Sequence, residues 1–134
     1  MTPKFRAYFH RYKRMIYNIG VVNENTILVD FNGDGDLETI FLTNDISLMQ
    51  STGLKDKNGN EIYESGILKI QTSDFYSKKI NDEYIGQVCF SRGGFFVLTD
   101  GHHTDFCLWG KSMATMEIIG NLYENPELLD EVEE

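Results

Sequence analysis

Hydrophobic and polar residues alternate over many short stretches of this chain, with the period of two that is typical of β-strands. The pattern is clearest at residues 84–90 and 95–99, which flank Ser91-Arg92-Gly93-Gly94 and predict a hairpin. Neither face of this hairpin is fully polar, so we expect burial on both sides of part of its sheet. Further strands are predicted over residues 4–8, 11–17, 26–31, 37–43, 45–51, 62–71, 106–109 and 117–123.

Turn residues separate these strands. Residues 32–36 read Asn-Gly-Asp-Gly-Asp, and residues 56–60 read Asp-Lys-Asn-Gly-Asn. Such residues tolerate the positive φ angles of tight turns, and Asn58-Gly59 predicts a type I′ geometry. Residues 10–13 are a weaker turn between the first two strands, and Ser65-Gly66 predicts a bend. We expect a mobile loop at residues 72–83 and a second loop at residues 100–105.

The C-terminal residues predict a short helix over residues 125–132. Asn125 can cap a helix, and Pro126 fits the first helical position. Leu128, Leu129 and Val132 lie at helical spacing, so one side can dock on the body of the protein. Together, the many short strands and this helix predict a mainly β, antiparallel fold, arranged as a barrel or as two packed sheets.

The 134 residues can form one domain with a single core or two small lobes. The formal net charge is −9, which opposes general binding to nucleic acid. The charge is uneven, because basic residues gather near the start (Lys4, Arg6, Arg11, Lys13, Arg14) and acidic residues near the end (Glu124, Glu127, Asp130, Glu131, Glu133, Glu134). One interpretation is that the basic segment is a solvent-exposed edge strand and the acidic segment a solvent-exposed C-terminal tail. The alternatives are that the two segments bind each other head to tail in neighbouring copies, or that the basic segment binds an acidic partner.

No apolar run is long enough to cross a bilayer, and the N-terminus lacks the apolar region of a secretory signal. We therefore expect a cytoplasmic protein. Cys89 and Cys107 are the two cysteines, without a CxxC spacing. We expect them to be reduced, buried thiols, and the alternatives are a disulfide or a metal-binding pair.

Three segments resemble the YopX family, small proteins carried mostly by phages and prophages of Gram-positive bacteria. Residues 4–7 and 13–17 are similar to the family's opening, residues 48–70 to its central signature, and residues 118–129 to its close. The resemblance implies strands in residues 1–47 packed beside an SH3-like small barrel in residues 48–134, all within a single domain of residues 1–134. It implies no biochemical activity, because the family has no established one.

One signature position departs from the family. Where the family commonly has Glu-Gly-Asp, this chain has Glu64-Ser65-Gly66, which keeps a flexible residue but removes a carboxylate. The signature residues are explained by turns and a barrel interior, or they include a contact surface of Lys55, Asp56, Lys57 and Glu64.

Residues 30–38 resemble a calcium loop, because oxygen-bearing residues alternate around glycines. The candidate ligands are Asp30, Asn32, Asp34, Asp36 and Glu38. Phe41 stands where an EF-hand needs a bidentate Glu, and the alternative is a hairpin turn that uses Asp, Asn and Gly for backbone reasons.

Catalytic motifs are absent from the sequence: there is no Ser-centred elbow, phosphate loop or HExxH. His102 and His103 are adjacent, so in a strand they point to opposite faces and cannot easily bind one metal ion. We predict no enzyme, catalytic residue, metal or cofactor. Our first hypothesis is a phage or prophage accessory protein that binds a protein partner or itself. The alternatives are a nucleic-acid-binding factor that uses Arg6, Arg11, Lys13 and Arg14 with stacking aromatics, and a calcium-binding β protein.

Overall fold

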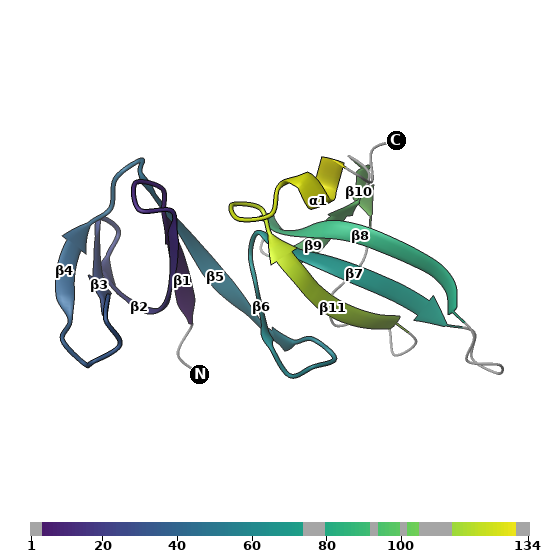
Figure 1. Cartoon of the computed structure of the whole chain (residues 1–134), viewed down its shortest axis with the longest axis horizontal. Coiled ribbons are helices and arrows are strands. Elements are labelled where there is room, and N and C mark those ends of the chain that lie inside the picture. The colour runs from purple at the N-terminus through teal and green to yellow at the C-terminus, as the bar shows by residue number, and fades with distance from the viewer. Residues whose placement is uncertain (1–3, 74–79, 92–93, 100–101, 105–113, 131–134) are drawn as a thin grey trace. The chain divides into compact units, whose positions relative to one another are not determined.

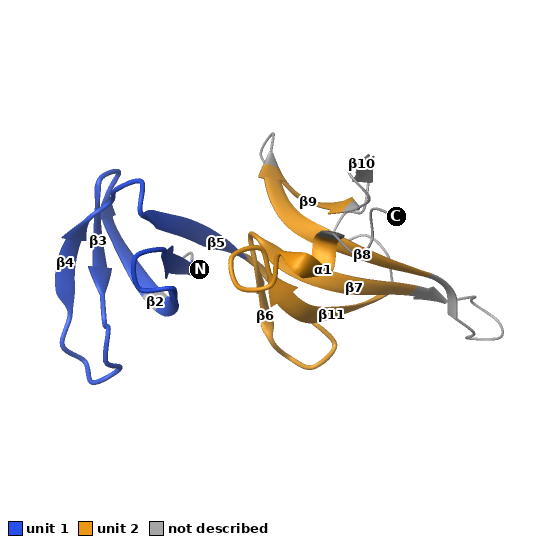
Figure 2. Cartoon of the chain, turned by 45° about the horizontal axis from the view of Figure 1, so that its top comes forward, with its two compact units in different colours: residues 1–51 blue, residues 52–134 orange. Residues whose placement is uncertain are grey.

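The structure is a computed structural model that describes residues 4–73, 80–91, 94–99, 102–104 and 114–130. Eleven β-strands and one short helix follow one another along these residues (Figure 1). The chain divides into two compact units, Met1–Ser51 (unit 1) and Thr52–Glu134 (unit 2), coloured separately in Figure 2. All strand pairings given below are antiparallel, so the expectation of a mainly β, antiparallel fold is confirmed.

Unit 1 is a sheet in which the first hairpin pairs with later strands on both sides. The strand order is β4-β3-β2-β1-β5. The strands are β1 (Phe5–Phe9), β2 (Arg14–Asn23), β3 (Thr26–Val29), β4 (Glu38–Phe41) and β5 (Ile46–Lys55). β5 begins in unit 1 and ends in unit 2, four residues beyond the predicted end of this strand at Ser51.

The core of unit 1 follows from the alternation in β1. Phe5, Ala7 and Phe9 lie on one face of the strand and pack into one cluster of apolar side chains. The other buried members of this cluster come from β2 and β3: Ile16, Ile19, Ile27 and Val29. The two predicted hairpins, β1–β2 and β3–β4, are therefore both present and share one core.

Unit 2 contains a second sheet with the strand order β10-β9-β8-β7-β11. Its strands are β7 (Gly66–Ser73), β8 (Ile80–Ser91), β9 (Gly94–Thr99), β10 (His102–Thr104) and β11 (Ala114–Asn121); β6 (Glu61–Tyr63) instead pairs with β5. A separate core contains Ile62, Leu68, Ile70, Val88 and Val97. The predicted SH3-like barrel is not confirmed, because the strands described here form an open sheet with β10 and β11 at its edges.

Several predicted boundaries change in unit 2. His102–Thr104 was expected to be part of a loop but pairs with β9 as a short strand. β7 and β8 extend into the expected loop at residues 72–83, because strand pairing continues as far as Ser73 and Ile80. The predicted strand at residues 106–109 lies outside the described residues.

The C-terminal helix is present as α1 (Glu127–Asp130), directly after Pro126, and it lies against β8. Leu128 and Leu129 are half-buried, as expected for a docked face. The helix begins at Glu127, one residue after Pro126, which was expected to be its first position, and Val132 lies outside the described residues. Within those residues, no helix has the length and apolar character needed to span a membrane.

Candidate protein-binding pocket

The turn between β1 and β2 is held in place by its own backbone and by Asp45. Tyr12 N–H donates to the Phe9 carbonyl at 3.2 Å, and Lys13 has a φ of 51°, which lets the chain reverse. Two more hydrogen bonds join the turn to Asp45, which lies outside it. His10 N–H donates to the Asp45 carbonyl at 2.9 Å, and Arg11 N–H donates to Asp45 Oδ2 at 3.1 Å. The turn that gave a weak signal in the sequence is therefore anchored from a distant part of unit 1.

Beside this turn lies a pocket of about 210 Å³, which we call the turn pocket; it is lined by Phe9, Tyr12, Arg14, Ile16 and Phe31. Phe9 and Ile16 are buried core residues, so the pocket is a partly open end of the unit 1 core. The Phe9 and Phe31 rings meet edge to face with their centroids 5.3 Å apart. Tyr12 is 64% exposed and forms part of the rim.

One cation, Arg14, lines the turn pocket, and two more, Arg11 and Lys13, lie in the adjoining turn. Arg11, Lys13 and Arg14 are all exposed, and Arg14 Nη2 donates to the backbone carbonyl of Phe31. The Arg11 guanidinium lies 5.9 Å from the centre of the Tyr12 ring, a cation–π arrangement. Arg14 is thus positioned by the wall of the pocket, and its guanidinium has further donors for a ligand.

Arg6 does not belong to this exposed group. It was predicted to be part of a basic strip, but it is only 6% exposed, and its guanidinium lies 5.9 Å from the centre of the Tyr17 ring. Its place on β1 between Phe5 and Ala7 explains the difference, because alternation puts Arg6 on the face opposite the unit 1 core. The sequence shows the cluster of positive charge, but it does not show that one member is buried.

The candidate calcium loop is explained by backbone hydrogen bonds. Asp30 Oδ1 accepts the N–H groups of Gly33 at 2.8 Å and Asp34 at 3.2 Å, and its Oδ2 accepts that of Gly35 at 3.0 Å. Gly33 and Gly35 both have positive φ, at 70° and 89°. Among the described residues, no group of three or more His, Cys, Asp and Glu could hold a metal ion.

Within the ranges that the structure describes, the cysteine and histidine side chains do not form a group that could hold a metal ion. Burial, and secondly the negative charge of Glu64, raise the pKa of the Cys89 thiol, which keeps it protonated and weakly nucleophilic. His102 and His103 are neighbours on β10. Cys107 lies outside the described residues.

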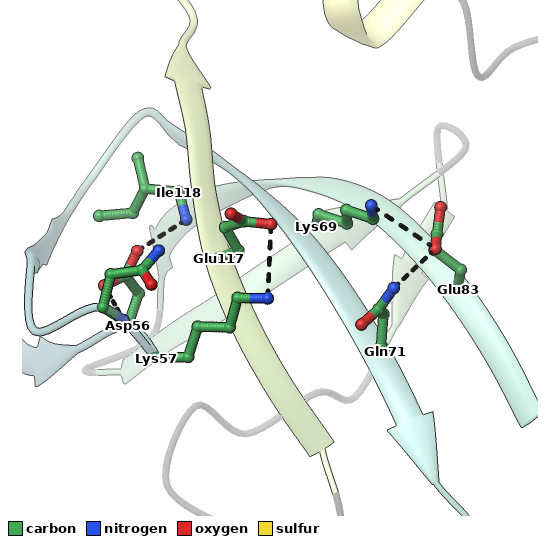
Figure 3. A network of polar contacts seen from close by, with 8 residues as sticks. Asp56, Lys57, Lys69, Gln71, Glu83, Glu117 and Ile118 are labelled. Atoms are coloured by element: carbon green, nitrogen blue, oxygen red, sulfur yellow. Dashed lines mark hydrogen bonds and ion pairs between the residues drawn. The ribbon is translucent and has the colours of Figure 1, made fainter. Parts of the chain in front are cut away.

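The central signature turn is organised by Asp56, whose side chain is buried (Figure 3). Asp56 Oδ1 accepts the N–H groups of Asn58 and Asn60, each at 2.9 Å, and Oδ2 accepts that of Ile118 on β11 at 3.0 Å. Lys57 N–H also donates to the Met116 carbonyl at 2.9 Å. The turn therefore occupies backbone groups at the outer edge of β11, and a protected edge cannot pair with another strand.

These hydrogen bonds decide the charge state of Asp56. Desolvation by burial acts to raise its pKa, but the N–H groups of Ile118, Asn60 and Asn58, with a smaller contribution from the charge of Lys57, outweigh it and lower the pKa. The carboxylate is thus held in its ionised form. Asp56 faces inward and is structural, so it is removed from the contact surface that was considered for the signature.

The same turn differs from its predicted type. Gly59 has a φ of 85°, whereas Lys13 and Ser65 are the non-glycine residues with positive φ in the described part of the chain, so Asn58 does not take the geometry of a type I′ turn. Gly59 N–H donates to the Asp56 carbonyl at 3.0 Å, and Asp56 N–H donates to the Asn60 carbonyl at 2.8 Å. The turn therefore closes between Asp56 and Asn60. The side chain of Asp56 stabilises this turn because it accepts the N–H groups of Asn58 and Asn60.

A row of opposite charges extends from the turn across three strands of unit 2 (Figure 3). Lys57 Nζ lies 3.8 Å from Glu117 Oε1, and Lys69 Nζ lies 3.8 Å from Glu83 Oε2. Glu117 and Lys69 are register partners on β11 and β7, and Gln71 Nε2 donates to Glu83 at 2.9 Å. These groups are partly exposed, so the row favours the strand register more than it adds stability.

The C-terminal signature segment of the family, residues 118–129, which we call the C-terminal close, is also held by a compact set of hydrogen bonds. Asn121 Oδ1 accepts the N–H groups of Tyr123 at 3.0 Å and Glu124 at 2.9 Å, and Asn125 Oδ1 accepts that of Asn121 at 3.2 Å. A side chain at Gly120 would place its Cβ 2.6 Å from Asn125 Oδ1, so glycine is required there. Leu122 N–H donates to the Ser65 carbonyl at 2.8 Å, which joins this close to the central signature.

Sequence reasoning did not find the turn pocket. Its walls come from two separate hairpins, and Phe9, Ile16 and Phe31 look like ordinary core residues in the sequence. The one available signal was the combination of Tyr12 with three cations in residues 11–14. Of the other predicted contact residues, Lys55 and Lys57 are exposed and Glu64 is half-buried.

These features define a small, mainly β, antiparallel protein with two compact units and two signature turns that serve the fold. The chain belongs to the YopX family, because the family model described as YopX protein matches residues 4–130. It is 30% identical over 118 residues to the SPbeta prophage-derived uncharacterized protein YopX of Bacillus subtilis strain 168, which covers 80% of this chain and 84% of that protein.

Solved structures show the same fold. The crystal structure of protein EF1440 from Enterococcus faecalis is 30% identical, covers 96% of this chain and 99% of its own, and superposes with a TM-score of 0.63. The crystal structure of YopX from Bacillus subtilis is 25% identical, has the same two coverages and superposes with a TM-score of 0.68. The resemblance seen in the sequence is therefore confirmed over nearly the whole chain.

Proposed function

We propose that this chain is a non-enzymatic protein-interaction module of phage or prophage origin, and that the turn pocket is its binding site. The observation that carries the proposal is the pocket itself: an apolar hollow at the open end of the unit 1 core, with exposed cations beside it. The prophage origin of the Bacillus subtilis relative supports the genetic setting. The expected cytoplasmic location stays a prediction.

The size of the turn pocket favours a side chain over a cofactor. Its volume of about 210 Å³ is below the range of roughly 300–1,000 Å³ that is usual for small-molecule sites. One aromatic or branched aliphatic side chain of a partner protein would fill such a hollow and bury the faces of Phe9 and Phe31. An exposed Tyr at the rim is a frequent anchor in protein interfaces.

The charge beside the pocket selects the neighbouring residues of the partner. Arg11, Lys13 and Arg14 are three of the four residues at positions 11–14, and the first acidic residue of the sequence is Glu24. A carboxylate next to the inserted apolar side chain would accept hydrogen bonds from the donors of Arg14 that remain. The partner segment is therefore an apolar residue flanked by Asp or Glu.

A pull-down from prophage-induced cells, followed by affinity measurement with the captured protein, tests this proposal. Tyr12→Ala and Arg14→Glu should each weaken binding by about tenfold or more, as expected for interface anchors. Lys4→Glu is the matched control for the change of charge, because Lys4 is an exposed cation of unit 1 at the end of β1 away from the turn. Equal binding by the wild type, Tyr12→Ala and Arg14→Glu would exclude the turn pocket as the site. The sequence-based suggestion that Lys55 and Lys57 contact the partner is tested by their alanine variants in the same assay.

The alternative is binding of single-stranded nucleic acid at the same turn, where Tyr12 and Arg11 could stack on a base. The burial of Arg6 removes one cation from the predicted strip and weakens this alternative. It requires an affinity for a labelled oligonucleotide that falls steeply as salt increases. Absence of binding at low ionic strength would exclude it.

A further inference from the structure

Among the strands that the structure describes, none pairs with the outer edge of β4, and three of the four residues of β4 are exposed. β4 is the last strand in the order β4-β3-β2-β1-β5, and Figure 1 shows it as the outermost strand of unit 1. Phe41 is 73% exposed and Leu37, immediately before the strand, is 59% exposed. The register with β3 is regular, without a bulge that would twist this edge away from a partner.

The pairing with β3 identifies the backbone groups that face outward. Leu42 N–H donates to the Asn25 carbonyl at 2.8 Å, and the register places Ile40 opposite Ile27 and Glu38 opposite Val29. In an antiparallel ladder, hydrogen-bonded pairs alternate along the strand. Residues 38, 40 and 42 therefore bond toward β3, and residues 37, 39 and 41 direct their N–H and C=O groups to the open edge.

We propose that a second copy of this chain pairs with the open edge, β4 against β4, as a symmetric antiparallel dimer centred on Thr39. A strand whose outward groups repeat every second residue is its own hydrogen-bonding complement under a twofold axis. This inference is independent of the turn pocket, which lies at the β1–β2 turn.

The side chains select the centre at Thr39 over its two neighbours. Pairing centred on Glu38 would set the two Glu38 carboxylates directly opposite each other, which is unfavourable. Pairing centred on Ile40 would place Phe41 opposite Thr39. When Thr39 is the centre, Phe41 of each copy lies opposite Leu37 of the other, and Glu38 lies opposite Ile40. This arrangement alone pairs the two exposed apolar residues and separates the like charges.

Analytical ultracentrifugation of the full chain, from about 10 µM to 1 mM in 0.5 M NaCl, tests the proposal, since a short interface of this kind belongs to the weak class. Higher salt should strengthen the dimer, because two chains of charge −9 repel each other. Phe41→Lys and Thr39→Pro should each raise the dimer dissociation constant by about tenfold or more. The Thr39 N–H faces away from β3, so Thr39→Pro should leave the thermal unfolding of the monomer little changed.

Val22→Lys is the matched control, because Val22 is 55% exposed on β2 and the substitution changes the charge equally. Site-directed cross-linking gives a second readout. With oxidised glutathione, Thr39→Cys should form a disulfide-linked dimer, because opposite residues in a hydrogen-bonded pair are about 5.5 Å apart between Cα atoms. Glu38→Cys should cross-link poorly, and the wild-type chain is the blank for the native cysteines. A monomer at every concentration, a dimer unaffected by Thr39→Pro, or equal cross-linking of both cysteine variants would each overturn the proposal.

Discussion

Asp56 Oδ2 accepts the backbone N–H of Ile118 at 3.0 Å, although 62 positions separate the two residues in the chain. This hydrogen bond ties the turn that precedes β6 to the outer edge of β11. It joins the central signature of the family to the start of its C-terminal close. Unit 2 therefore depends on a contact that its two sequence motifs make together.

We expect Asp56→Ala to lower the free energy of unfolding by about 2–3 kcal/mol, since buried N–H groups would lose an ionised acceptor. Thermal and urea unfolding followed by circular dichroism measure the loss. Asp36→Ala, at an exposed residue of unit 1, is the control and should change stability by less than about 0.5 kcal/mol. Equal effects of the two substitutions would contradict the structural role of Asp56.

The contribution of Asp56 should depend on pH. Its pKa is lower in the folded protein than the ordinary value of 3.8, so the unfolded chain binds the proton more readily. The stabilisation is complete above that ordinary value and is lost as the pH falls through the folded pKa. The difference in melting temperature between wild type and Asp56→Asn should thus be constant from about pH 5 to 8 and shrink below about pH 4. A difference that grows on acidification would contradict this assignment.

Ser65→Gly should stabilise the protein. Ser65 has a φ of 67°, in the left-handed region that favours glycine, at the position where the family commonly has Gly. Relief of this backbone strain should exceed the added entropy of the unfolded chain and contribute about 0.5–1 kcal/mol. Differential scanning calorimetry would show a higher melting temperature. Gly59→Ala tests the same reasoning in reverse, because Gly59 has a φ of 85° and its substitution should destabilise the turn.

Gly120→Ala should destabilise the C-terminal close by about 1–3 kcal/mol, the usual range for overpacking. The new Cβ would lie 2.6 Å from Asn125 Oδ1, so the hydrogen bond from Asn121 N–H would be displaced. The double variant Gly120→Ala with Asn125→Ala should show non-additive destabilisation in thermal unfolding, because both changes disrupt one contact. Strict additivity would mean that Gly120 is needed for another reason.

Calcium should leave the stability of unit 1 unchanged. Asp30 uses both carboxylate oxygens to accept N–H groups of Gly33, Asp34 and Gly35. Asp30→Ala should therefore lower stability by about 1–2 kcal/mol with or without calcium, as for other turn and capping carboxylates. Melting curves in calcium and in chelator make the comparison. A higher melting temperature of the wild type in calcium, absent from Asp30→Ala, would establish a calcium site instead.

The sequence by itself determined most of the strands and the hairpins β1–β2, β3–β4 and β8–β9. Alternation in β1 and in the β8–β9 hairpin indicated strands because the period of a pleated strand is local. Gly33, Gly35 and Gly59 marked turns because backbone strain is also local. The family signature was readable for the same reason, since its turns require particular residues at particular positions.

Only the tertiary structure decided which residues serve the fold and which remain for binding. In the sequence, Asp56 and Lys57 are both charged residues of one turn, and either could be exposed. The carboxylate of Asp56 points inward because β11 presents the Ile118 N–H there, whereas Lys57 is exposed. Arg6 is buried while Arg14 borders a pocket. Contacts between distant segments also decide whether a sheet closes into a barrel or stays open, as it does in unit 2. The same holds for the free edge of β4 and for the walls of the turn pocket. Local sequence patterns do not encode such contacts.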